Sequence, residues 1–189
     1  MDYKKLKGKV KEMISHKRYV HTLGVVESAI DLADRYGCDI EKTRIAALCH
    51  DCAKNLTREE LLEKSERYGL DLDEIVFYET QLMHGPVGSA IAKFELGIDD
   101  EEIISAISHH TTGKKEMGLL EKIIYLSDFI EPGRDYTGVE ELRKLSMVDL
   151  DRALIMAFDN TIRYVLSLNS VLHPNTIEAR NNLIMKIGG

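Results

Sequence analysis

The stretch from Ile45 to Lys54 carries the residue types that most directly suggest chemistry. It reads Ile-Ala-Ala-Leu-Cys-His-Asp-Cys-Ala-Lys, so a histidine and an aspartate stand side by side at the end of an apolar run. If the run is helical, the side chains of His50 and Asp51 project about 100° apart and can bind one ion between them. Lys54 follows one turn later on the same side. A bare His-Asp pair is more often a solvated helix end, so its meaning depends on the rest of the chain.

Further histidines and a distant aspartate occur elsewhere, in apolar segments or at expected helix ends. Each of them alone would be interpreted as a satisfied core residue. Together they are costly to place in apolar surroundings unless a metal ion or a charged partner compensates them. Imidazole and carboxylate donors without a set of thiolates favour iron, manganese or another divalent ion of similar hardness. The candidates are His21, His50, Asp51, His84, His110 and Asp128.

Two of the three cysteines flank the central pair, and Cys49 and Cys52 have the C-x-x-C spacing of zinc and redox sites. A second such pair is absent from the sequence, and no strand-like segment precedes this one, as a thioredoxin-like arrangement would need. We therefore predict that both cysteines are buried on the core side of the helix.

Composition restricts the class of protein. A chain of 189 residues with 44% hydrophobic residues suits one well-packed domain. The formal net charge of −7 argues against a general nucleic-acid-binding protein, which needs a basic surface. No apolar run reaches the roughly 18 residues that a membrane span requires. The first residues do not resemble a secretory signal, so we expect no membrane association and a cytoplasmic location.

Helical spacing of apolar residues recurs along most of the chain, and strand-like alternation is absent from the sequence, so we predict an all-α fold. Ser15 is expected to cap a long helix that ends at Gly37. Pro86 suits the first turn of a helix, which would place His84 at a helix entrance. The predicted helices cover 3–14, 16–36, a segment from 39, a segment from 58, 71–78, 86–97, 103–110, 119–130, 149–168 and a segment after 173–176.

Taken together, these segments resemble the HD-domain metal-dependent phosphohydrolases and, more narrowly, the YqeK family of symmetrical dinucleoside tetraphosphate hydrolases. The resemblance extends over nearly the whole chain and is far more specific than a His-Asp pair. The matching segments are Arg18–Thr22, His50–Lys54, His84–Gly88, His110–Gly113, Ser127–Arg134, His173–Thr176 and Ala179–Asn181.

The resemblance implies an all-α HD-domain helical bundle in a single domain over 1–189. A metal-site core would span about 16–135, and C-terminal helices over 139–187 would complete the bundle and the nucleotide pocket. It also implies that the metal, iron foremost and manganese or another divalent ion otherwise, is held by four ligands. These are His21, His50, Asp51 and Asp128.

Further roles follow from the same resemblance. Diadenosine tetraphosphate would be split symmetrically into two ADP by metal-activated water, with catalytic roles for Asp51, Lys54, His84 and His110. The two histidines would hold phosphate oxygens or assist proton transfer, and cations would neutralise the polyphosphate. The implied substrate-binding residues are Arg18, His21, Asp51, Cys52, Ala53, Lys54, His84, His110, Asp128, Arg134, His173, Pro174, Asn175, Thr176, Ile177 and Glu178.

Several alternatives stay open at this point. The chain could be another HD-type phosphohydrolase, such as a nucleotidase or a guanosine alarmone hydrolase, or a nucleotide-sensing module without turnover. His109 stands next to the expected histidine, and relatives with adjacent histidines can hold two metals, so a second metal is not excluded. A homodimer is compatible with the sequence.

Overall fold

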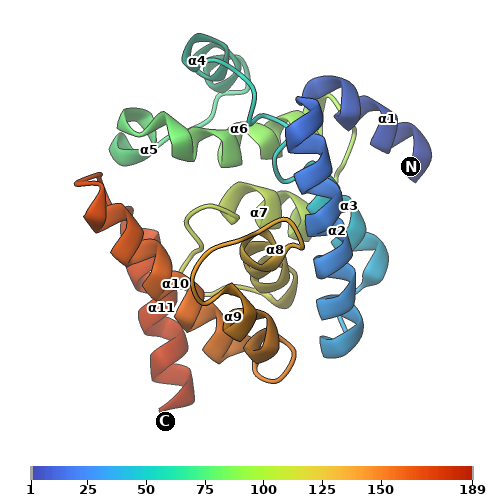
Figure 1. The fold of residues 1–189 in the computed structure, drawn as a ribbon. Coiled ribbons are helices and arrows are strands. Elements are labelled where there is room, and N and C mark those ends of the chain that lie inside the picture. Colours follow the sequence, from blue (N-terminus) through green and yellow to red (C-terminus); the bar gives the residue numbers. More distant parts are fainter. Residues whose placement is uncertain (1, 189) are drawn as a thin grey trace.

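The computed structural model describes residues 2–188 and places eleven α-helices and no strand within them, which confirms the all-α prediction (Figure 1). Short turns and loops join the helices. The helices are α1 (Tyr3–Met13), α2 (His16–Tyr36), α3 (Ile40–Cys49), α4 (Arg58–Arg67), α5 (Glu74–Tyr78), α6 (Thr80–Phe94), α7 (Glu101–His109), α8 (Leu119–Ile130), α9 (Val139–Ser146), α10 (Leu150–Ser167) and α11 (Pro174–Ile187).

Helices α7 and α8 lie in the middle of the molecule and are covered from several sides. Helix α2 packs along α3 and α8, helix α6 packs on α7, and α10 packs against α8, α9 and α11. Figure 1 shows α2 and α3 on one flank of this central pair and α10 and α11 on the other, with α4 to α6 across one end. Residues far apart in the sequence therefore meet around α7 and α8.

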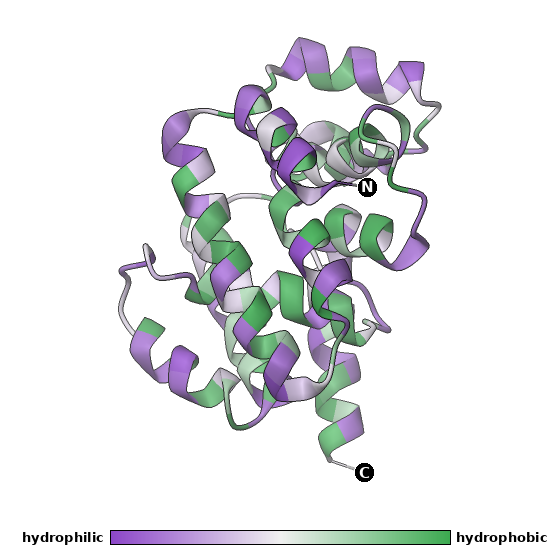
Figure 2. Cartoon of the chain, turned by 90° about the vertical axis from the view of Figure 1, so that its right-hand side faces the viewer, coloured by the Kyte–Doolittle hydropathy of each residue, from purple (hydrophilic) through white to green (hydrophobic). Residues whose placement is uncertain are grey.

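Helix α8 forms much of the hydrophobic core because it is apolar on nearly all its faces. Tyr125 is fully buried, and its ring stacks on Phe129 and lies 4.4 Å from the ring centre of Phe158 in α10. Figure 2 shows hydrophilic residues gathered on the outward faces of the peripheral helices. Within residues 2–188, no helix is both long and apolar enough to cross a bilayer.

The predicted boundaries of the long helix α2 are confirmed. The Ser15 side chain accepts a hydrogen bond from the backbone N–H of Arg18 and so caps the first turn. At the other end, Gly37 adopts a left-handed conformation with φ of 72°, which glycine reaches without strain from a side chain. These caps fix the length and start of the helix that presents His21.

The prediction that Pro86 begins a helix is wrong. Helix α6 starts at Thr80 and continues through Pro86, so His84 lies in the second turn rather than at a helix entrance. A proline removes only one backbone donor, here the one that the Leu82 carbonyl would use. The helix persists because it buries Met83, His84 and the apolar residues that follow.

The segment that carries the His-Asp pair also differs in detail from a continuous helix. Helix α3 ends at Cys49, and His50 is its C-cap. Tight turns follow, in which the N–H of Cys52 donates to the Cys49 carbonyl and that of Lys54 donates to the Asp51 carbonyl. The pair therefore projects from the end of the helix rather than from its side.

Candidate metal centre

Three histidines share one local arrangement that fixes how their rings point. In His50, His84 and His110, Nδ1 donates to the backbone carbonyl of the residue three positions earlier. A carbonyl oxygen can only accept, so Nδ1 carries the proton, and in the neutral ring Nε2 offers a lone pair. The acceptors are the carbonyls of Ala47, Gln81 and Ile107, at 2.6, 2.6 and 2.7 Å.

His21 is oriented by a side chain instead of the backbone. Its Nδ1 lies 3.1 Å from Oε1 of Glu131, a buried carboxylate that also accepts from the Gly133 N–H at 2.6 Å. Helix α2 comes this close because position 24 is glycine. A Cβ on Gly24 would lie 2.6 Å from Oε2 of Glu131. The Nε2 atom of His21 consequently points away from Glu131 and toward Asp51.

Asp51 lies where these rings converge, and its two carboxylate oxygens face different groups. Oδ2 lies 3.3 Å from Nε2 of His50, 3.7 Å from Nε2 of His21 and 2.9 Å from Nη1 of Arg18. Burial opposes the charge of Asp51, but the charge of His50 and the facing imidazoles of His110 and His84 hold its pKa well below the usual range. Asp51 is therefore ionised at neutral pH.

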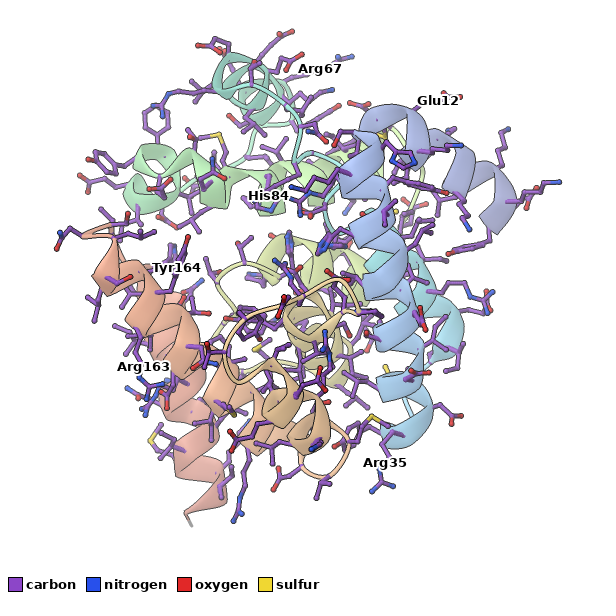
Figure 3. The ribbon with its side chains drawn as sticks, in the orientation of Figure 1. Glu12, Arg35, Arg67, His84, Arg163 and Tyr164 are labelled. Atoms are coloured by element: carbon purple, nitrogen blue, oxygen red, sulfur yellow. The ribbon has the colours of Figure 1, made fainter. Side chains whose placement is uncertain are left out.

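The other oxygen, Oδ1, lies 3.1 Å from Nε2 of His84 and 3.5 Å from Nε2 of His110. These two nitrogens are 3.0 Å apart. Burial lowers the pKa of His84 to about 4, so this ring is neutral at pH 7. His84 projects from α6 toward the middle of the molecule (Figure 3). Asp51 is thus shared by two groups that could hold a metal ion, His21–His50–Asp51 and Asp51–His84–His110.

Asp128, on α8, lies beside the first of these groups. Its Oδ1 is 3.0 Å from Nε2 of His21, and Arg134 binds the same oxygen. Burial works against its charge, but the facing imidazole of His21 and the charge of Arg134 lower the pKa of Asp128. The structure therefore brings the four expected ligands together, with His21, His50 and Asp51 as the tightest set.

Two buried nitrogens show that the centre fits a cation. Nε2 of His21 and Nε2 of His50 make no hydrogen bond with any part of the chain that the structure describes. Buried polar atoms are almost always satisfied. Both nitrogens lie near anionic carboxylate oxygens, and a divalent ion that binds imidazole and carboxylate would satisfy all of these atoms at once. The donor set and its geometry therefore fit a divalent metal ion.

The neighbouring cysteines do not belong to this centre. Cys49 is fully buried, and Cys52 is buried with its thiol donating to the Gly88 carbonyl, which confirms the prediction that both face the core. Burial raises the pKa of Cys49 to about 12, so its thiolate is disfavoured. Ala53 is buried as well, and neither it nor Cys52 exposes side-chain surface toward a ligand.

Three cations face the centre from different elements, as expected. Arg18 of α2 pairs with Asp51, and Arg134 pairs with Asp128. Nζ of Lys54 lies 3.4 Å from Nδ1 of His84, and burial lowers the pKa of Lys54. These side chains add positive charge beside the carboxylates, where a bound anion would also lie.

The first turn of α11 lies against the loop that follows His110. Thr176 donates its hydroxyl proton to the Thr112 carbonyl at 3.1 Å, and Nε2 of His173 pairs with Asp73 at 2.9 Å. A cavity of about 160 Å³ is lined by His173, Asn175 and residues flanking His110. Of the other expected residues here, Pro174, Ile177 and Glu178 are exposed to solvent.

Sequence reasoning missed two side chains that hold the site in place. Glu131 received no role, although it orients His21. The second of these side chains is Arg143 of α9. It donates to the carbonyls of Ile130, Glu131 and Arg134 at 2.9, 2.7 and 2.9 Å, and so fixes the Glu131–Arg134 turn. Glu131 was detectable as a charged residue directly after an apolar helix, whereas nothing local in the sequence marks Arg143.

His109 lies outside both groups of potential ligands. Its Nδ1 contacts the carbonyl of Ser105 in its own helix at 2.9 Å, and its nearest carboxylate, Glu121, is 3.9 Å away. The adjacent His110 takes the inward position because it caps the end of α7.

Histidines and aspartates from several helices converge in this all-α fold, and this arrangement is typical of one class of protein. The model of the HD domain family matches residues 18–133, and the chain belongs to this family.

Three relatives define its position within the class more narrowly. The chain is 42% identical over 177 residues to a protein of Halalkalibacterium halodurans named "Bis(5'-nucleosyl)-tetraphosphatase, symmetrical", covering 94% of each chain. A Bacillus subtilis protein of the same name is 41% identical over 93% of this chain and 94% of its own length. A crystal structure from Clostridium acetobutylicum, described as a predicted HD superfamily hydrolase involved in NAD metabolism, matches with a TM-score of 0.95 and 48% identity, covering 98% of each chain.

Proposed function

We propose that this protein is a metal-dependent hydrolase that splits diadenosine tetraphosphate symmetrically into two ADP. The relatives that carry this activity in their names match nearly their full length. The observation that carries the proposal is the cluster of imidazole nitrogens around the two oxygens of Asp51, which is complete in this chain. A module that only sensed nucleotides would not need this complete cluster of potential metal ligands.

His21, His50, Asp51 and Asp128 are the proposed ligands of the main metal, with iron foremost and manganese as the alternative. When bound, the metal supplies Lewis acidity and lowers the pKa of a coordinated water. The chain contributes the orientation of the ligands. Glu131 fixes the ring of His21, and the Ala47 carbonyl fixes that of His50.

A second ion beside Asp51 is supported by the spacing of His84 and His110. In neutral rings both Nε2 atoms carry lone pairs, because each Nδ1 donates to a carbonyl. Two lone pairs 3.0 Å apart repel, and a proton or a cation between them relieves the repulsion. Analysis of metal content distinguishes the two cases, since a shared proton leaves a single ion per chain.

The remaining chemistry falls on the side chains that face the substrate. His84 and His110 accept a proton or hold a phosphate oxygen. Arg18, Lys54 and Arg134 offset the negative charge that builds up on the phosphates and on the departing ADP. One nucleotide unit lies toward the cavity beside His173, with Pro174, Asn175, Thr176, Ile177 and Glu178 around it.

The test is turnover of a substrate panel by protein purified without oxygen, after chelation and after return of Fe²⁺ or Mn²⁺. The panel contains diadenosine tetraphosphate, AMP, a guanosine alarmone and NAD⁺, with products separated by chromatography. We expect metal-dependent conversion of diadenosine tetraphosphate to ADP alone. Formation of ATP and AMP would contradict symmetrical cleavage, and preference for AMP or the alarmone would favour the nucleotidase or alarmone hydrolase alternative. Binding without turnover of any of them would indicate a sensing module. The cytoplasmic location and the homodimer stay predictions.

A further inference from the structure

A second, larger cavity opens beside the metal centre. Its volume is about 800 Å³, and it lies between the first half of α2, the Lys54–Asn55 turn and the Glu131–Arg134 turn. His21, Arg18, Lys54 and Arg134 line its inner end, so it begins at the metal centre. None of the residues that line the cavity beside His173 also lines this one.

The walls of this cavity combine positive charge with exposed apolar surface. Lys17 adds a fourth cation at the outer end, next to the three that face the carboxylates. Val20, Leu23 and Pro132 supply apolar surface, and the Val20 residue is 56% exposed. Lys17, Val20, Gly24 and Glu27 are spaced three or four residues apart, so one face of α2 forms the wall. The Glu131 carboxylate is occupied by His21 and Gly133.

A substrate cleaved at its centre needs room on both sides of the reacting phosphate. Diadenosine tetraphosphate places an adenosine and two phosphates on each side of the central bridge. The cavity beside His173, with about 160 Å³, is too small to hold both halves. The second half must leave the metal centre in another direction, and the cavity beside α2 begins there and is lined by cations followed by apolar residues.

We propose that the cavity between α2 and the Glu131–Arg134 turn binds the second nucleoside diphosphate unit of the substrate. This inference rests on the proposed function and names the second half of its binding site. The phosphates lie between Arg18, Lys54 and Arg134, and the nucleoside packs on Val20, Leu23 and Pro132. A monophosphate substrate would leave this cavity unused.

The first experiment compares two substrates in the metal-loaded enzyme. Adenosine 5′-tetraphosphate has the same four phosphates as diadenosine tetraphosphate but only one adenosine. We expect wild-type enzyme to prefer the dinucleoside in kcat/KM, and Val20→Glu to reduce that preference about tenfold, as loss of an apolar contact commonly does. The same substitution at Val148, which is 74% exposed in the turn between α9 and α10, is the matched control and should keep the wild-type preference.

The second experiment measures binding without turnover. Equilibrium dialysis of the metal-loaded enzyme with ADP should give two ADP per chain for wild type and for Val148→Glu. In Val20→Glu one of the two sites should weaken about tenfold or more. Unfolding midpoints of the three proteins should agree closely, because both substituted side chains are exposed.

The outcomes separate the two proposals. An enzyme that converts diadenosine tetraphosphate to ADP but binds one ADP, or whose substrate preference is the same in Val20→Glu and wild type, contradicts the second subsite alone. An enzyme without activity on diadenosine tetraphosphate contradicts the proposed function, whatever the dialysis shows. Equal losses on both substrates in Val20→Glu would place its effect on the shared phosphates and overturn the nucleoside contact.

Discussion

The centre around Asp51 and the turn from Glu131 to Arg134 lie side by side but are built differently. The centre is buried, and the rings of His50 and His110 are fixed by backbone carbonyls of the helices that carry them. The turn has an exposed proline and glycine and depends on hydrogen bonds from Arg143, a residue of a different helix. The comparison indicates that the rings of His50 and His110 are oriented by their own helices, whereas Arg134 lies on a turn that is held by a residue of another helix.

The strongest test of this contrast is Asp51→Ala. It removes the carboxylate that both groups of potential ligands share, and no neutral side chain replaces it. We expect loss of metal retention and of hydrolysis together, measured by elemental analysis and product formation. A variant with full metal content and activity would show that the centre lies elsewhere.

Lys54→Ala and Arg134→Ala should separate substrate contact from metal binding. Removal of one donor that stabilises a transition state costs on the order of 2–4 kcal/mol, so kcat/KM should fall by roughly two to three orders of magnitude. Metal content should stay at the wild-type level. Arg134→Lys should recover only part of the rate, because a point charge does not reproduce a bidentate contact. Loss of metal in the Ala variants would instead assign these residues to the support of the centre.

Glu131 belongs to both regions, and Glu131→Gln tests the connection between them. The carboxylate accepts one hydrogen bond from His21 on Oε1 and one from Gly133 on Oε2. In glutamine one of these two oxygens is replaced by an NH2 group, so either His21 or Gly133 would face a donor instead of an acceptor. We expect metal affinity to fall about 10- to 100-fold, as for other partners of metal-binding histidines, measured by titration of the metal-free protein. The Glu27→Gln variant, on the same face of α2 as Gly24, should bind metal normally.

Arg143→Ala should have the smallest effect and only on the turn. Without its guanidinium, the carbonyls of Ile130, Glu131 and Arg134 lose their donor, and the position of Arg134 becomes less defined. We expect kcat/KM to fall about tenfold while metal content is retained. Arg152→Ala, which removes an exposed arginine paired with Asp149, is the control. Equal losses in both variants would remove the special role of Arg143.

The sequence was sufficient to predict those features of the fold and the site that depend on residues close together in the chain. Helical periodicity and caps such as Ser15 predicted most helices, and the adjacency of His50 and Asp51 drew attention to the centre. The resemblance placed Asp128 beside His21, which spacing alone could not do. Pro86 misled because burial of the surrounding residues outweighs one lost donor.

Contacts across long sequence separations could not be predicted. The bonds of Glu131 to His21 and of Arg143 to the Glu131–Arg134 turn depend on how α2, α8 and α9 pack, and no periodicity in the sequence records that packing. The pair between His173 and Asp73 joins residues 100 positions apart and has the same cause.

The carbonyls that orient His50 and His110 have a consequence for how the enzyme matures. Ala47 and Ile107 belong to the last turns of α3 and α7, where carbonyls lack partners within the helix. The imidazoles satisfy these carbonyls. The same hydrogen bonds orient His50 and His110, both potential metal ligands, before any ion binds. We therefore expect the newly made chain to fold first and acquire its metal afterwards, with loading limited by delivery of the ion rather than by refolding of the protein.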